Sequence, residues 1–120
     1  MKINIKRTDT VTNHTLVEFA EAGKVQPLSS GTFAGVAENC RQLTVLEDGV
    51  EVIYDICTLI THGSCIAQLS GTAPQNGSDA FINGSSVSST GSTQIGIIVA
   101  RAFPESGDYV DGDLVNVVLT

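Results

Sequence analysis

Apolar and polar residues alternate on both sides of an Asp-Gly pair in the segment LTVLEDGVEVIY, residues 43–54. A repeat of two is the repeat of a β-strand with one covered face. Asp-Gly accepts the positive φ angles of a two-residue hairpin turn. The segment therefore predicts a β-hairpin that turns at Asp48-Gly49. Its alternating apolar positions are Leu43, Val45, Val50, Val52 and Tyr54.

Short strand-like segments continue along the rest of the chain, separated by turn residues. They include VEVIYDICTLI (50–60), SCIAQLS (64–70) and DLVNVVLT (113–120). The one candidate helix is NHTLVEFAEA (13–22), with Gly23 as a C-cap, although TLVEF within it also fits a strand. We predict an all-β chain, a small antiparallel β-barrel or sandwich with an extended N-terminal arm and at most one short helix.

The size and composition of the chain indicate one core of aliphatic side chains. A chain of 120 residues is long enough for one domain. Because Trp is absent and aromatic residues make up only 5%, Val, Ile, Leu and Ala must fill the interior. We expect four residues on apolar strand faces to be buried: Val52, Ile98, Val117 and Leu119.

The segment GSDAFINGSSVSSTGSTQIGIIVARA, residues 77–102, is rich in Gly, Ser and Thr. A flexible linker would join two domains, and too little chain follows to form a second one. A phosphate-binding loop would lead into a helix and carry a Lys, whereas this segment contains no Lys and leads into a strand pattern. We therefore predict β-structure with an exposed Ser/Thr-rich surface.

The N-terminal segment MKINIKRTDTVTN combines positive charge with an alternating pattern. This pattern predicts that the chain divides into two parts. Residues 1–13 would form an extended arm, and residues 14–120 a single β-barrel-like domain. A basic strand on an acidic body suits pairing with another chain through main-chain hydrogen bonds. The candidate residues for capsid or inter-subunit contact are Lys2, Ile3, Ile5, Lys6 and Arg7.

Charge and motif content argue against several classes of function. The net charge of −7 would repel a phosphate backbone, so no nucleic-acid partner is expected. No segment is apolar enough for a signal peptide or a membrane span, so we expect synthesis in a cytoplasm and no membrane partner. The common hydrolase, zinc-protease and nucleotide-binding motifs are absent, which favours a protein without enzymatic activity.

Three cysteines and a histidine supply four soft atoms, the number that a structural zinc site uses. However, the spacing of Cys40, Cys57, His62 and Cys65 matches no known zinc pattern. CTLITHGSC (57–65) also reads as two strands joined by a His-Gly turn. We expect reduced, buried thiols and no metal or other cofactor. A thiol–imidazole enzyme that uses His62 with Cys57 or Cys65 is the rival interpretation.

The order of four segments resembles the small decoration (cement) proteins of tailed-bacteriophage capsids. These segments are GTFAGVAEN (31–39), LEDGVEVIYD (46–55), the Gly/Ser-rich segment 77–102 and DGDLVNVVLT (111–120). Within them, residues 79–89, 96–100 and 114–119 correspond to the segments of that family. The resemblance covers residues 24–120 and leaves the N-terminal arm unmatched.

This resemblance implies a non-enzymatic virion protein with a compact β-barrel-like body. It implies binding to the major capsid protein on the outer surface of the expanded shell, which the protein would stabilise. It also implies a homotrimer at the threefold sites of the shell. The alternative is another virion or secreted β-module, such as a tail or fibre domain or a glycan-binding domain.

Overall fold

The computed structural model describes residues 1–103 and 107–120. Its elements are strands joined by turns, and one 3-10 turn, η1, spans Glu21–Gly23. The strands of the first half are β1 (Lys2–Arg7), β2 (Leu16–Phe19), β3 (Lys24–Pro27), β4 (Phe33–Glu47) and β5 (Val50–Ile60). Those of the second half are β6 (Gly63–Gln68), β7 (Ser78–Asn83), β8 (Ser86–Ser88), β9 (Gln94–Ile98) and β10 (Leu114–Leu119). The prediction of an all-β chain is confirmed.

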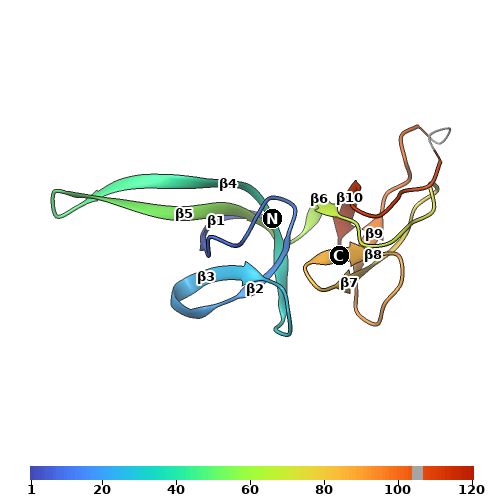
Figure 1. Ribbon diagram of the computed structural model, residues 1–120, viewed down its shortest axis with the longest axis horizontal. Helices are drawn as coiled ribbons and strands as arrows, with labels where there is room; N and C mark the ends of the chain where they lie inside the picture. The colour runs from blue at the N-terminus through green and yellow to red at the C-terminus, as the bar shows by residue number, and fades with distance from the viewer. Residues whose placement is uncertain (104–106) are drawn as a thin grey trace.

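The first five strands form a closed barrel in the order β1-β3-β2-β4-β5 (Figure 1). Closure depends on β1, which pairs with β5 in antiparallel fashion and with β3 in parallel. Ile5 from β1 packs against the buried cluster in the barrel interior. The prediction of an extended arm over residues 1–13 is therefore wrong, because both edges of Lys2–Arg7 pair within the same chain.

The second half forms a five-stranded sheet in the order β6-β10-β9-β7-β8. The Gly/Ser-rich segment 77–102 supplies three of these strands, which confirms its prediction as β-structure. Gly96 lies so close to β10 that an added Cβ would stand 2.0 Å from the Val118 carbonyl oxygen, so only glycine fits there. An isolated bridge between Leu69 and Val87 links the end of β6 to β8.

Two apolar clusters stabilise the molecule. One fills the barrel with buried residues such as Val17, Cys57 and Leu59. The other joins Leu16, Val36 and Ile60 of the barrel strands to side chains of the second sheet, so the two halves share a core. Three of the four predicted core residues, Ile98, Val117 and Leu119, are buried in this shared cluster.

The fourth predicted core residue, Val52, is only half-buried, and its prediction is wrong. It lies on the part of β5 that pairs with β4 alone, because β1 reaches β5 only from Ile56 to Ile60. The candidate helix over 13–22 is also absent, since Leu16–Phe19 forms β2 and only Glu21–Gly23 makes a 3-10 turn. Across residues 1–103 and 107–120, no helix is long and apolar enough to cross a membrane.

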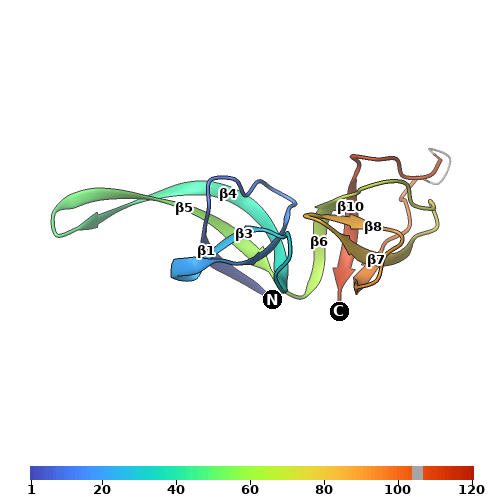
Figure 2. The same cartoon turned by 60° about the horizontal axis from the view of Figure 1, so that its bottom comes forward.

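The molecule is elongated, with principal extents of 56 × 28 × 22 Å. Figures 1 and 2 show the second sheet at one end, the barrel in the middle and the β4–β5 hairpin projecting at the other end. The hairpin turns at Asp48 and Gly49, whose φ angles are 52° and 78°. The predicted Asp-Gly hairpin is thus confirmed, although it projects from the barrel.

Candidate interaction surface

The projecting part of the β4–β5 hairpin, residues 42–55, exposes an unusual amount of apolar surface. Leu46 is 72% exposed, Val50 63% and Ile53 61%. A two-stranded ribbon is only marginally stable in water without a packing partner, and clustered apolar exposure marks interaction sites. The hairpin is therefore the leading candidate for a binding element.

The strand register gives the hairpin two different faces. Leu43 lies opposite Tyr54, and Val45 opposite Val52, so these four side chains share one face, here called the outer hairpin face. Thr44 lies opposite Ile53 on the reverse face, where Leu46 pairs with Glu51. The outer hairpin face is the more continuously apolar of the two.

At the base of the hairpin, the outer hairpin face meets a row of cations on the outside of the barrel. Arg41 pairs with Ile56, Ile56 with Lys6, and Lys6 with Lys24, so the three basic residues lie in one row across β4, β5, β1 and β3. We call Arg41, Lys6 and Lys24 the cation row. A groove of about 320 Å³ beside Lys6 and Arg41 continues onto Leu43.

Two residues of the cation row are held by other side chains or the backbone: Arg41 by hydrogen bonds and Lys6 by an aromatic ring. The Arg41 guanidinium donates to the Asn39 carbonyl at 2.8 Å and to Oδ1 of Asn4 at 3.3 Å. The Lys6 ammonium lies 4.4 Å from the centroid of the Tyr54 ring, a cation–π contact between the cation row and the outer hairpin face. The Tyr54 hydroxyl in turn donates to the Glu47 carboxylate near the turn, and this bond raises the pKa of Tyr54.

The five candidate contact residues from the sequence lie on β1, and their environments differ. Lys2 and Lys6 are exposed, and Ile3 is 40% exposed, whereas Ile5 is half-buried and the Arg7 side chain is mostly buried. Ile5 faces the barrel interior. The role of these residues in binding a capsid or another subunit stays a prediction.

Arg7 closes one end of the barrel. Its guanidinium donates to the carbonyls of Ile56 at 2.9 Å, Val11 at 3.3 Å and Arg41 at 3.3 Å. It also lies 3.8 Å from the Asp55 carboxylate, and its side chain is only 11% exposed. Because its donors bind backbone carbonyls inside the chain, Arg7 stabilises the barrel and is poorly placed to contact a partner.

A second buried ionisable group, Glu18, anchors the loop before β4. Its carboxylate accepts hydrogen bonds from the backbone N–H groups of Ser29 at 2.6 Å and Gly31 at 3.3 Å, and from the Gln26 amide. The bond from Ser29 is the main cause that lowers the pKa of Glu18. A Cβ at Gly31 would stand 2.2 Å from the Glu18 carboxylate, so a larger residue there would have to displace the carboxylate from these hydrogen bonds.

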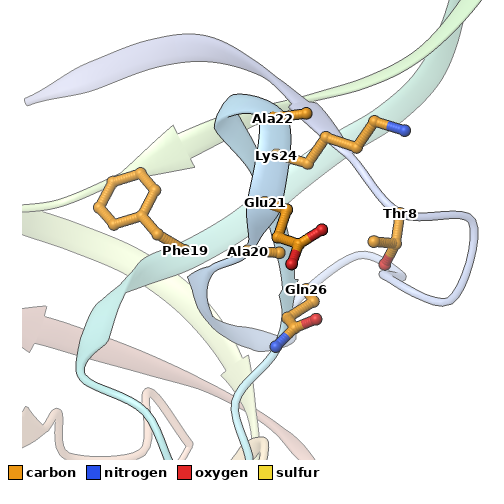
Figure 3. A pocket seen from close by; sticks show the side chains of 7 residues that line it. All are labelled: Thr8, Phe19, Ala20, Glu21, Ala22, Lys24 and Gln26. Atoms are coloured by element: carbon orange, nitrogen blue, oxygen red, sulfur yellow. The ribbon is translucent and has the colours of Figure 1, made fainter.

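An open groove of about 740 Å³ lies beside the 3-10 turn (Figure 3). Phe19, which is 60% exposed, borders it, and in Figure 3 its ring points away from Glu21 and Lys24. The lining has one carboxylate and one ammonium group but no histidine or cysteine. Glu21 and Lys24 therefore give this groove one group of each charge.

The structure does not bring the four candidate zinc ligands together. Cys57 lies in the barrel cluster, whereas Cys65 belongs to the cluster shared with the second sheet. In the part of the chain that the structure describes, no group of three or more His, Cys, Asp or Glu side chains is arranged to hold a metal ion. Burial raises the pKa values of the Cys57 and Cys65 thiols to about 11.

No family model and no curated protein sequence matches the chain. Its structure is similar to the crystal structure of a C-terminal fragment of gene product 12 from bacteriophage phi29, with a TM-score of 0.53. The similarity covers 98% of each chain, and the sequences are 12% identical. At this identity the comparison establishes a shared fold.

Sequence reasoning missed that the β4–β5 hairpin projects without other strands beside it. Alternation in residues 43–54 predicts the two strands but not their neighbours. The feature that shows the projection is the difference in length between the strands. β4 and β5 span 15 and 11 residues, whereas β1, β2 and β3 span only 6, 4 and 4. The short strands cannot flank the long pair along its whole length.

Proposed function

We propose that this chain is a structural protein of a bacteriophage virion, which acts by binding protein surfaces and catalyses no reaction. The observation that carries the proposal is the fold shared over 98% of both chains with a phage gene product. The exposed apolar hairpin supports a binding role, because such surface is costly to leave in water.

The sequence resemblance to decoration proteins supports a finer proposal: the chain binds the outside of a phage capsid and stabilises the shell. Its partner would be the major capsid protein. A body with many backbone hydrogen bonds and no catalytic motif suits a reinforcing role. The acidic net charge of −7 would keep many unassembled copies soluble.

Binding to heads tests the finer proposal. Purified protein is mixed with expanded heads that lack it, the heads are pelleted, and bound protein is measured at low and high salt. Saturable binding, together with a higher melting temperature of the heads, is the expected result. Heads that pellet without the protein, and melt unchanged, would contradict capsid binding.

A second candidate is a module of a tail or fibre. The phi29 chain that shares the fold is itself a C-terminal fragment of a phage gene product, which favours use of this fold as one module of a longer chain. Gold-labelled antibody against this chain, applied to complete virions, separates the two candidates. Label over the head supports decoration, and label confined to the tail supports the second candidate.

A further inference from the structure

The outer hairpin face carries opposite charges at its two ends. At the turn, Glu47 lies on this face and Asp48 follows it. At the base, Lys6 and Arg41 of the cation row lie on the same side of the sheet as Leu43 and Tyr54. Between Gln42 and Asp55 the sequence contains no basic residue. The surface thus runs from acidic, through apolar, to basic.

The spacing of these three parts is nearly symmetric. Along β4, Arg41 and Asp48 are about 23 Å apart at the rise of a strand. The midpoint falls between the Leu43–Tyr54 and Val45–Val52 pairs, which are the apolar centre of the face. If a second hairpin is laid on this face in the opposite direction, apolar centre meets apolar centre. Each acidic turn then meets the cation row of the other copy.

We propose that two copies of this chain pair through their outer hairpin faces, antiparallel and related by a twofold axis. Leu43, Val45 and Val52 of each copy would pack together at the centre. Glu47 of each copy would lie near Lys6 and Arg41 of the other. A twofold contact uses the same patch on both subunits, so that patch must be self-complementary, as this one is.

Charge complementarity favours a second copy over an unrelated partner. An acidic partner surface would attract the cation row but repel Glu47 and Asp48. A basic partner surface would attract Glu47 and Asp48 but repel the cation row. The same chain offers both charges at the required separation. Pairing also gives the two-stranded ribbon the packing partner that it lacks. This inference does not depend on the virion role, and it differs from the threefold trimer that the sequence resemblance implies.

The test measures the mass of the purified protein by sedimentation equilibrium over a range of concentrations. The monomer mass is 12.5 kDa, and we expect a dimer of twice that mass. Leu43→Glu, on the outer hairpin face, should raise the dissociation constant at least about tenfold. Leu46→Glu is the matched control, because the same change lies on the reverse face and should leave the dimer intact.

Charge reversal provides a second test that does not disturb the apolar centre. Lys6→Glu and Glu47→Lys should each weaken the dimer, and the double variant should restore it, since the opposite charges meet again with their signs exchanged. High salt should weaken the wild-type dimer. A monomer at every concentration, a trimer, equal effects of Leu43→Glu and Leu46→Glu, or a double variant no tighter than either single variant would each overturn the inference.

Discussion

Replacement of Arg7 by Met is the most direct way to test whether the N-terminal segment is a barrel strand or a free arm. Methionine keeps most of the length of the side chain but removes its charge and all of its donors. The carbonyls of Ile56, Val11 and Arg41 then lose a donor, and the Asp55 carboxylate loses its cation. A free arm would tolerate this change without loss of stability.

The size of the effect follows from the burial of Arg7. With 11% of the side chain exposed, water can replace few of the lost bonds. A buried carbonyl left without a donor costs about 1–3 kcal/mol, and removal of one partner from a buried ion pair costs about 3–5 kcal/mol. Since Asp55 is itself one-third exposed, we expect a total loss near the lower end, about 3 kcal/mol.

Urea unfolding at neutral pH measures this loss as a change in the free energy of unfolding. Arg7→Lys should lower the free energy of unfolding by less than Arg7→Met does, because lysine keeps the positive charge although it lacks the planar set of donors. Lys2→Met is the control on the same strand, and it should change stability by less than about 0.5 kcal/mol because Lys2 is exposed. If Arg7→Met costs less than about 1 kcal/mol, the proposed role of Arg7 in closing the barrel is refuted.

Three further predictions concern the core, a buried carboxylate and the thiols. Val117→Ala should lower the free energy of unfolding by about 1–3 kcal/mol, as measured in urea, because the side chain is fully buried. Glu18→Gln should lower the melting temperature at neutral pH. The folded-state pKa of Glu18 lies below the ordinary value of 4.5, so the carboxylate stabilises the fold fully above pH 4.5 and loses this effect as the pH falls further. The difference in melting temperature between wild type and variant should therefore become smaller below pH 4.5. Because burial raises their pKa values, Cys57 and Cys65 should resist alkylation by iodoacetamide at mildly alkaline pH until the protein unfolds. Mass spectrometry measures the alkylation, and rapid reaction of either thiol in the folded protein would contradict its burial.

The sequence was informative where a local pattern decides the structure. Asp48 and Gly49 determine a turn by their own backbone preferences, and Ile98 and Val117 belong to strands with one apolar face. Val52 has the same alternating pattern but is half-buried. Alternation shows which side chains share a face, but whether that face is covered depends on strands far away in the chain.

The N-terminal strand shows the same limit more sharply. The alternation of Ile3 and Ile5 with charged residues correctly indicates a strand over residues 2–7. Its partner β5 begins at Val50, and no local signal in either segment identifies the other. The cation row was likewise out of reach, because Lys6 and Arg41 become neighbours only through β5, which lies between them.

The position of β1 in the barrel has a consequence for the order in which the chain folds. Lys2–Arg7 is synthesised before both of its partners, and Lys2 pairs with Ile60. The barrel therefore closes only after synthesis has passed Ile60, and such non-local closure slows folding. Until then the edge of β1 that pairs with β5 is unpaired and open to pairing with other nascent chains. Lys2 and Lys6 would protect it during that interval, since charged side chains discourage edge-to-edge aggregation.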